Sequence, residues 1–294
     1  DITESRRQQA AELGLRATDS LSEMLSWDIE LVVITTHSAL HHQIALEVAS
    51  AGKHMLIEKP IAVNAEDSRD MVDAARENGV VLTVFHNRHF DADYRMVKAA
   101  VREGLLGDLV TVENRTLGSS PAVGFGAADY NREWRVTAAA GGGTLLDFGP
   151  HWVEQILDLM EGRKVVQVWG DVRHFKWGDA DDHFRIEMVF DNGTRAVAGK
   201  TDIAYCGMPY KWLIIGTEAT LRGPANDRVV VHGPEYELAR TTASPSLSIH
   251  ENLARHIREG EGLIITPEHV MRVMDVLSAG VASSQAGKSL DVEI

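Results

Sequence analysis

The chain has 294 residues, of which 44% are hydrophobic and 24% are charged, a composition typical of a globular protein in water. Its 29 Lys and Arg residues against 43 Asp and Glu residues give a formal net charge of −14. An acidic surface repels nucleic-acid phosphates and anionic lipid, so neither nucleic acid nor membrane is expected as a partner.

Cys206 is the only cysteine, so no disulfide can form within the chain. A chain without disulfides fits a reducing compartment, and we expect a cytoplasmic location. A single cysteine is more often a buried small hydrophobe than a nucleophile. The histidines lack partners at zinc-ligand spacing, and no metal site is predicted.

The first part of the chain alternates helical patterns with short apolar runs. Helices are predicted over residues 4–13, 20–27, 39–51 and 64–78, and strands over 30–36, 54–58 and 80–85. Short β-branched runs joined by brief links are typical of strands buried on both faces of a parallel sheet. The alternation predicts a doubly wound α/β domain over residues 1–88.

Beyond residue 88 the pattern changes. Helices are predicted over residues 94–103, 150–160 and 267–285, with one strand at 109–117 and mainly strands from 164 to 238. Residues 183–190 alternate strictly between apolar and mixed side chains, which indicates an antiparallel strand with one buried face. We expect a second α/β domain over residues 89–294, with the mixed sheet face forming an oligomer contact.

Polar residues follow all three strands of the first domain, at 35–38, 58–60 and 86–88. Ligands bind at the carboxyl ends of strands in open α/β sheets, so these segments predict a ligand crevice. Lys59 directly follows an apolar strand, where partial burial lowers the pKa of an amine and suits it to donate to a substrate oxygen. The alternative is a surface lysine paired with Glu58.

Asp147 and His151 are four residues apart and share a face if the segment is helical. Pro150 favours a helix that begins at 148–150, which places Asp147 at its start and His151 in its first turn. A carboxylate near an imidazole raises its basicity, as a general base requires. The alternative is that Asp147 caps the helix and His151 is a partly buried helix residue.

In their order along the chain, these motifs resemble the Gfo/Idh/MocA oxidoreductases, the relatives of glucose–fructose oxidoreductase and inositol dehydrogenase, over nearly the whole chain. The segments that carry the resemblance are Thr36-His37-Ser38, Glu58-Lys59-Pro60, Asn87-Arg88, Trp134-Arg135 and Gly141-Gly142-Gly143 followed by Asp147-x-Gly149-x-His151.

The resemblance implies an N-terminal Rossmann domain that binds NAD, with NADP possible. It also implies a second α/β domain whose large, open, mostly antiparallel sheet often forms homodimers or homotetramers. Members of the family oxidise a hydroxyl of a sugar, polyol or cyclitol, or run the reverse reduction. Substrate specificity is expected to depend on the loop at residues 118–132.

The resemblance also implies residue roles. Lys59 polarises the reacting hydroxyl, His151 is the base, and Asp147 is its partner or a second substrate ligand. The residues expected to bind the cofactor are Asp1, Thr35, Thr36, His37, Ser38, His41, Glu58, Lys59, Asn87, Trp134 and Arg135. The chain departs from the family pattern at His37 and Ser38, commonly Pro and Asn, and at Glu154, often Asp.

The family's first strand and glycine-rich phosphate loop, a unit of about 30 residues, are expected to precede Asp1, which leaves the Rossmann sheet N-terminally incomplete. Asp1 then corresponds to the acidic residue that bonds the adenosine ribose and favours NAD. Two alternatives remain open: a relative that cleaves glycosidic bonds through transient oxidation, and a non-catalytic regulator that binds a dinucleotide or a sugar.

Overall fold

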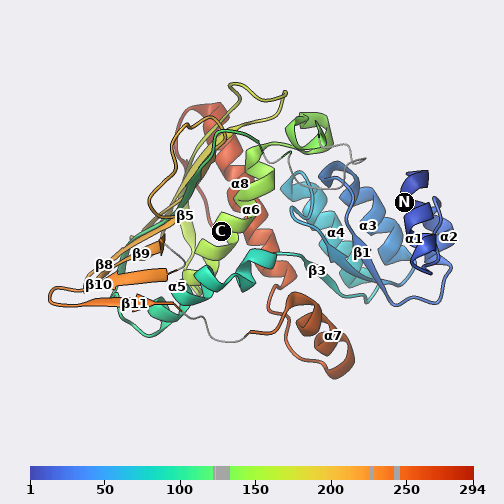
Figure 1. Ribbon diagram of the computed structural model, residues 1–294, viewed down its shortest axis with the longest axis horizontal. Coiled ribbons are helices and arrows are strands. Elements are labelled where there is room, and N and C mark those ends of the chain that lie inside the picture. The colour runs from blue at the N-terminus through green and yellow to red at the C-terminus, as the bar shows by residue number, and fades with distance from the viewer. Residues whose placement is uncertain (122, 124–132, 226–227, 242–245) are drawn as a thin grey trace.

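The computed structural model describes residues 1–121, 123, 133–225, 228–241 and 246–294. Within these ranges the chain forms one sheet of three strands and one of nine, with helices packed against both (Figure 1). The predicted fold class, a parallel Rossmann-like sheet followed by a large, mostly antiparallel sheet, is confirmed. The division at residue 88 stays a prediction, although the last strand of the small sheet ends before it.

The small sheet is parallel and has the order β1-β2-β3, with strands β1 (Leu31–Ile34), β2 (His54–Ile57) and β3 (Leu82–Val84). The helices and 3-10 turn of this part are α1 (Glu4–Glu12), α2 (Leu21–Leu25), η1 (Ser38–Leu40), α3 (His41–Ser50) and α4 (Ala65–Glu77). Asn64 caps α4 by accepting a hydrogen bond from the Asp67 amide at 2.8 Å. Parallel pairing brings the carboxyl ends of the three strands to one edge.

The large sheet has the order β11-β10-β9-β8-β4-β7-β6-β5-β12. Its strands are β4 (Leu109–Leu117), β5 (Val165–Arg173), β6 (His183–Phe190), β7 (Arg195–Thr201), β8 (Trp212–Gly216), β9 (Thr220–Ala225), β10 (Arg228–His232), β11 (Glu237–Arg240) and β12 (Leu290–Asp291). Its pairs are antiparallel except β4 with β7. β6 shows the predicted alternation of buried and half-buried residues.

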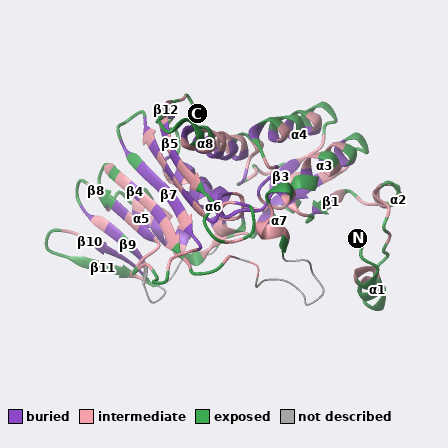
Figure 2. Ribbon diagram, turned by 90° about the horizontal axis from the view of Figure 1, so that it is seen from above, coloured by how far each residue is buried: buried purple, intermediate pink, exposed green. Residues whose placement is uncertain are grey.

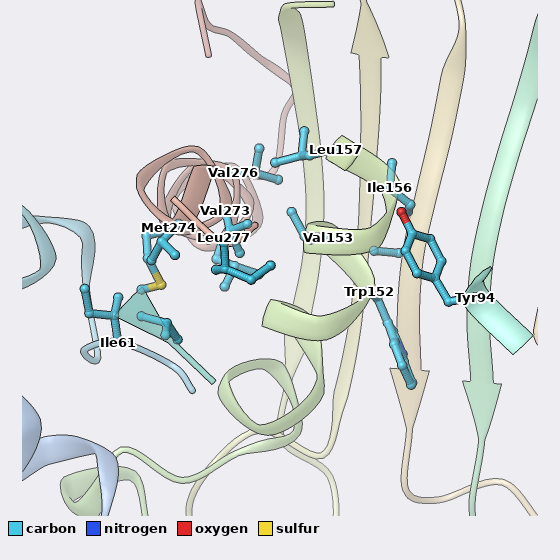
Figure 3. Packing of buried hydrophobic residues seen from close by; sticks show 14 of the residues in the cluster. Ile61, Tyr94, Trp152, Val153, Ile156, Leu157, Val273, Met274, Val276 and Leu277 are labelled. Carbon is cyan, nitrogen blue, oxygen red and sulfur yellow. The ribbon is translucent and has the colours of Figure 1, made fainter. Parts of the chain in front are cut away.

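The remaining helices and 3-10 turns of the described chain come after the small sheet, and three of the helices pack against strands of the large sheet. They are η2 (Asn87–Phe90), α5 (Ala92–Arg102), η4 (Glu133–Val136), η5 (Ala138–Ala140), α6 (Thr144–Leu159), α7 (Ile249–Glu259) and α8 (Pro267–Ala286). α8 packs against α6 and β5 and also against α4. Val153 and Leu157 of α6 lie beside Val276 of α8 (Figure 3), and buried residues concentrate along this seam and the sheet (Figure 2).

Three further findings concern expectations from the sequence. Cys206, expected to be buried, is exposed, because it lies in the connection between β7 and β8 rather than in a packed element. No helix among the described residues is both long and apolar enough to cross a bilayer. Among the same residues, no group of three or more His, Cys, Asp or Glu side chains is placed to hold a metal ion.

Close backbone contact between β5 and α8 should make Gly170 intolerant of a side chain. A Cβ at Gly170 would overlap the carbonyl of Gly280, which is backbone and cannot move aside. We expect Gly170→Ala to lower the free energy of unfolding by about 2 kcal/mol, measured by urea denaturation. Gly262→Ala is the control, since a Cβ there meets nothing within 4 Å. Equal stability of the two variants would contradict this packing.

Candidate active site

Lys59 enters the site from the carboxyl end of β2 and reaches the start of α6. Its Nζ donates to the backbone carbonyl of Asp147 and to Oδ1 of the same residue, each at 2.6 Å. Both side chains are largely buried, with 14% and 13% of their surface exposed. The lysine is therefore neither a surface residue nor paired with Glu58 in an ion pair; its carboxylate partner lies 88 residues away.

Asp147 holds a second cation as well. Nη1 of Arg135 donates to the same Oδ1 at 2.8 Å, and the Arg135 guanidinium lies 4.7 Å from the centre of the Trp134 ring. Burial alone would raise the pKa of Asp147, but the charges of Lys59 and Arg135 outweigh it and lower that pKa. The carboxylate is therefore ionised at neutral pH.

Helix α6 begins at Thr144, not at 148–150 as Pro150 led us to expect. Asp181 lies ahead of the helix: its backbone carbonyl accepts from the Thr144 amide at 2.8 Å, and its Oδ2 accepts from the Leu145 amide at 2.7 Å. Gly143 makes room for this approach, because a Cβ there would overlap the Asp181 carboxylate. A cap supplied by a distant segment lets the helix start early, with Asp147 in its first turn and Pro150 inside it.

The expected pairing of Asp147 with His151 is not found. No hydrogen bond or ion pair links the two across the part of the chain that the structure describes, and Asp147 is engaged by Lys59 and Arg135 instead. His151 is 4% exposed. Burial, followed by the positive charge of Lys59, lowers the pKa of His151 well below its usual value, so the ring is neutral at neutral pH.

A second group of buried polar side chains lies behind His151, and sequence reasoning missed it. Glu154 is fully buried, and its Oε1 lies 2.7 Å from Nδ1 of His89 and 3.3 Å from Nε2 of His269. The His86 ring meets the His151 ring edge-on, with centroids 6.3 Å apart. The signals were weak: His86 is the second residue after β3, and Glu154 stood out in the sequence only as a departure from a family position that is often Asp.

A cavity of about 600 Å³ lies beside this group. Phe148 and Trp152 of α6 line it, together with Arg88, Lys200 and Lys211. Arg88 and Lys211 are also close enough to His151 to contribute to the lowering of its pKa, after burial and the charges of Lys59 and His86. Trp152, the residue after His151, lines the cavity, whereas His151 itself is buried and is not one of the lining residues.

The cations of this cavity are paired and stand near aromatic rings. Arg88 pairs with Asp91 at 3.3 Å and Lys211 with Asp93 at 3.1 Å. Lys211 Nζ lies 4.6 Å from the centre of the Trp152 ring, and Lys200, paired with Asp202, lies 4.3 Å from the centre of the Phe148 ring. The lining thus offers hydrogen-bond donors and acceptors around two apolar ring faces.

Some of the residues expected to bind the cofactor lie around one cavity, and others lie elsewhere. Ser38, Lys59, Trp134 and Arg135 line one small cavity together with Asp147. The rings of His37 and Trp134 are 6.3 Å apart. This cavity brings together segments 35–38 and 58–60 of the predicted crevice with 134–135, whereas no residue of the third predicted segment, 86–88, lines it.

The other residues expected to bind the cofactor do not line this small cavity. His41 is buried, with its ring nitrogens 2.9 Å from the Pro60 carbonyl and 3.1 Å from the Thr36 carbonyl, so it ties two strand ends together rather than facing a ligand. Thr35, Thr36 and Asn87 are exposed, and Glu58 is half-buried.

Asp1 lies next to α1, where its carboxylate accepts from the Thr3 amide at 2.8 Å. Its role at the ribose stays a prediction. Much of the loop expected to set specificity, residues 118–132, lies outside the described residues.

The charge of Asp147 should be coupled to that of Lys59. We expect Asp147→Asn to cost about 3 kcal/mol in urea denaturation, because it leaves Lys59 and Arg135 buried without their shared anion. Adding Lys59→Met to Asp147→Asn should recover at least half of that loss. Strictly additive effects of the two substitutions would mean that the pair does not act as a unit.

Two family models match the chain. One, described as the GFO/IDH/MocA C-terminal domain, matches residues 94–222. The other, described as an oxidoreductase family with an NAD-binding Rossmann fold, matches residues 1–86.

Individual relatives agree with these models. The scyllo-inositol 2-dehydrogenase (NADP(+)) IolW of Bacillus subtilis (strain 168) is 28% identical over 299 residues, covering 90% of this chain and 79% of the relative. The 1,5-anhydro-D-fructose reductase of Ensifer adhaerens is 34% identical over 145 residues, covering 48% of this chain and 41% of the relative.

Solved structures share the fold. The WlbA dehydrogenase from Bordetella pertussis, solved with NADH and UDP-GlcNAcA, has a TM-score of 0.83 and 26% identity, over 100% of this chain and 89% of that one. An NAD-binding protein from Listeria innocua has a TM-score of 0.87 and 24% identity, over 99% of this chain and 87% of that one. The family resemblance drawn from the motifs is confirmed: the chain belongs to the Gfo/Idh/MocA family of NAD-binding oxidoreductases.

Proposed function

We propose that this protein oxidises a hydroxyl group of a sugar, polyol or cyclitol with NAD or NADP, or runs the reverse reduction. The observation that carries the proposal is the convergence of Lys59 and Asp147 at the carboxyl ends of parallel strands, with His151 close behind and an adjoining cavity. Ligands of open α/β sheets bind at that edge.

The residues present fit the nicotinamide side of the cofactor. Nδ1 of His37 is buried without a hydrogen-bond partner among the described residues, at the end of β1 and beside Trp134, so it leaves a polar atom for a ligand. We propose that His37, Ser38, Trp134 and Arg135 hold that half of the dinucleotide. When bound, the nicotinamide takes up or gives back a hydride.

Lys59, His151 and Asp147 then have distinct roles. Lys59, fixed by two bonds to Asp147, keeps a donor available to the substrate oxygen and stabilises negative charge that develops there. His151 is neutral and accepts the hydroxyl proton at an imidazole nitrogen. Asp147 orients Lys59 and Arg135, which differs from the partner role expected from its spacing to His151.

The cavity beside His151 suits a polyhydroxylated ring. Phe148 and Trp152 offer apolar faces for the C–H side of such a ring, and paired cations and carboxylates around them offer donors and acceptors for its hydroxyls. Relatives named for scyllo-inositol and 1,5-anhydro-D-fructose support this substrate class for the present chain.

Loss of the Lys59 amine or of the His151 imidazole should strongly lower turnover. We expect Lys59→Met and His151→Gln each to lower kcat for polyol oxidation by at least about a hundredfold, followed by the absorbance of reduced cofactor. Lys53→Met and His42→Gln are matched controls from outside the site.

Three other results would each contradict a different part of the proposal. Wild-type turnover in both site variants would overturn the assigned roles. Cofactor binding without turnover of any polyol would favour the regulator alternative. Release of free sugar without net cofactor reduction would favour glycosidic cleavage.

We also propose that the open face of the large sheet joins copies of this chain. Trp169, Glu187 and Val197 stand opposite one another on β5, β6 and β7, which makes this face a mixture of apolar and charged residues. Val110 and Ile215, on the paired strands β4 and β8, are 48% and 39% exposed. Exposed apolar side chains on an open sheet face are of the kind that an interface between subunits buries.

A charge placed on this face should separate the copies. We expect light scattering to give the wild-type chain at least twice the monomer mass, and Trp169→Glu to reduce it to the monomer mass. A monomeric wild type, or an assembly unaffected by Trp169→Glu and by Ile215→Glu, would remove the proposal.

A further inference from the structure

Three cations lie close enough to the base to affect its pKa. His151 is buried near Lys59, Arg88 and Lys211, and the positive charges of all three lower its pKa. The carboxylate of Asp147 is already shared by Lys59 and Arg135. A proton accepted by His151 would therefore add a further positive charge to a buried site where the Asp147 carboxylate is already engaged.

Glu154 is a buried anion close behind this site. It is fully buried, three residues after His151 on α6, and its Oε2 has no hydrogen-bond partner among the residues that the structure describes. Burial raises its pKa, but contacts with His269 and His89 outweigh burial and lower the pKa to about 2. The carboxylate is therefore ionised throughout the neutral range.

His86 packs against His151 and is close enough to Glu154 to be affected by its charge. It follows β3, is 2% exposed, and meets the His151 ring edge-on at 6.3 Å between centroids and an interplanar angle of 83°. Burial lowers the pKa of His86 to about 4, while the charge of Glu154 acts to raise it. Nδ1 of both rings is buried without a partner in the described ranges, so neither nitrogen is committed to another group.

We propose that Glu154, acting through His86, is the counter-charge of the base: its carboxylate stabilises the positive charge that forms when His151 accepts the hydroxyl proton of the substrate. The inference rests on the proposed function. The proton would move from the substrate oxygen to the imidazole, and the carbon-bound hydrogen would leave with its electron pair for the oxidised nicotinamide, so that the carbinol becomes a carbonyl. Glu154 and His86 are positioning residues, since neither forms nor breaks a covalent bond.

Other titratable groups surround this anion and must be kept constant in any test. Those on the elements packed around it are Lys59, Arg88, His89, Tyr94, Lys98, Asp158, Lys211 and His269. His89 also contacts Lys98, whose Nζ lies 3.4 Å from its Nε2. The proposal therefore requires a substitution that removes the charge of Glu154 and keeps its shape.

Glu154→Gln is that substitution, because the amide oxygen can still accept from His89. We expect kcat of polyol oxidation to fall about tenfold, with the KM for substrate and the Kd for NADH changed less than about threefold. The acidic limb of kcat/KM against pH should move about one pH unit lower, because losing a nearby anion lowers the pKa of the base.

Two further variants serve as controls. Glu154→Asp keeps the charge and should retain kcat within about threefold of wild type. Asp275→Asn removes a carboxylate from α8, where it pairs with Arg69 at the surface, and should leave the limb unmoved. An unmoved limb in a folded Glu154→Gln protein would overturn the proposal and leave Glu154 with a structural role.

A second measurement needs no substrate and separates this inference from the proposed function. In NMR titrations of the full chain, with resonances assigned through His86→Gln, His86 should be half-protonated near pH 4 in the wild type. In Glu154→Gln that midpoint should lie about one pH unit lower. Identical His86 titrations would overturn the inference whatever the turnover, while a shifted titration without polyol turnover in the wild type would support the coupling of Glu154 to His86 and overturn the proposed function.

Discussion

The buried ion pair between Lys59 and Asp147 is the interaction on which the rest of the site depends. It joins the carboxyl end of β2 to the first turn of α6 and so connects the small parallel sheet with the helices of the large sheet. Removing one partner of a buried pair costs far more than removing both, so each half of the site requires the other. Asp181 and Gly143 make the contact geometrically possible, since together they let α6 begin ahead of Asp147.

Because Asp147 pairs with Lys59 and Arg135, its carboxylate is not paired with His151. A carboxylate four residues before a histidine on a helix is expected to orient and activate it. Here that carboxylate is held by Lys59 and Arg135, while Glu154, three residues after His151 on the same helix, is a buried anion whose Oε2 has no partner among the described residues. In the mechanism we propose, Asp147 orients Lys59 and Glu154 stabilises the charged form of His151, so two carboxylates of one helix have separate roles. Two cations lower the pKa of Asp147, and burial with nearby positive charge lowers the pKa of His151, so both values lie below their usual ranges.

Features with local causes were predictable from the sequence. The strict alternation of β6, the Asn64 cap of α4 and the start of α8 at Pro267 all follow from residues within the element itself. The order of the motifs was enough to indicate the family. The start of α6 was not predictable, because its cap comes from Asp181, 36 residues away from Leu145.

Contacts between side chains far apart in the sequence were equally unpredictable. Nothing near Lys59 in the sequence names Asp147 as its partner, and the contacts of Glu154 come from η2 and α8. His41 was expected to face a ligand, but both its ring nitrogens lie against backbone carbonyls. The most direct test of the account uses a polyol deuterated at every carbinol carbon, with mass spectrometry of the cofactor. The account predicts reduced nicotinamide that carries one deuterium from the substrate; a cofactor that stays oxidised, or is reduced without deuterium, would contradict it.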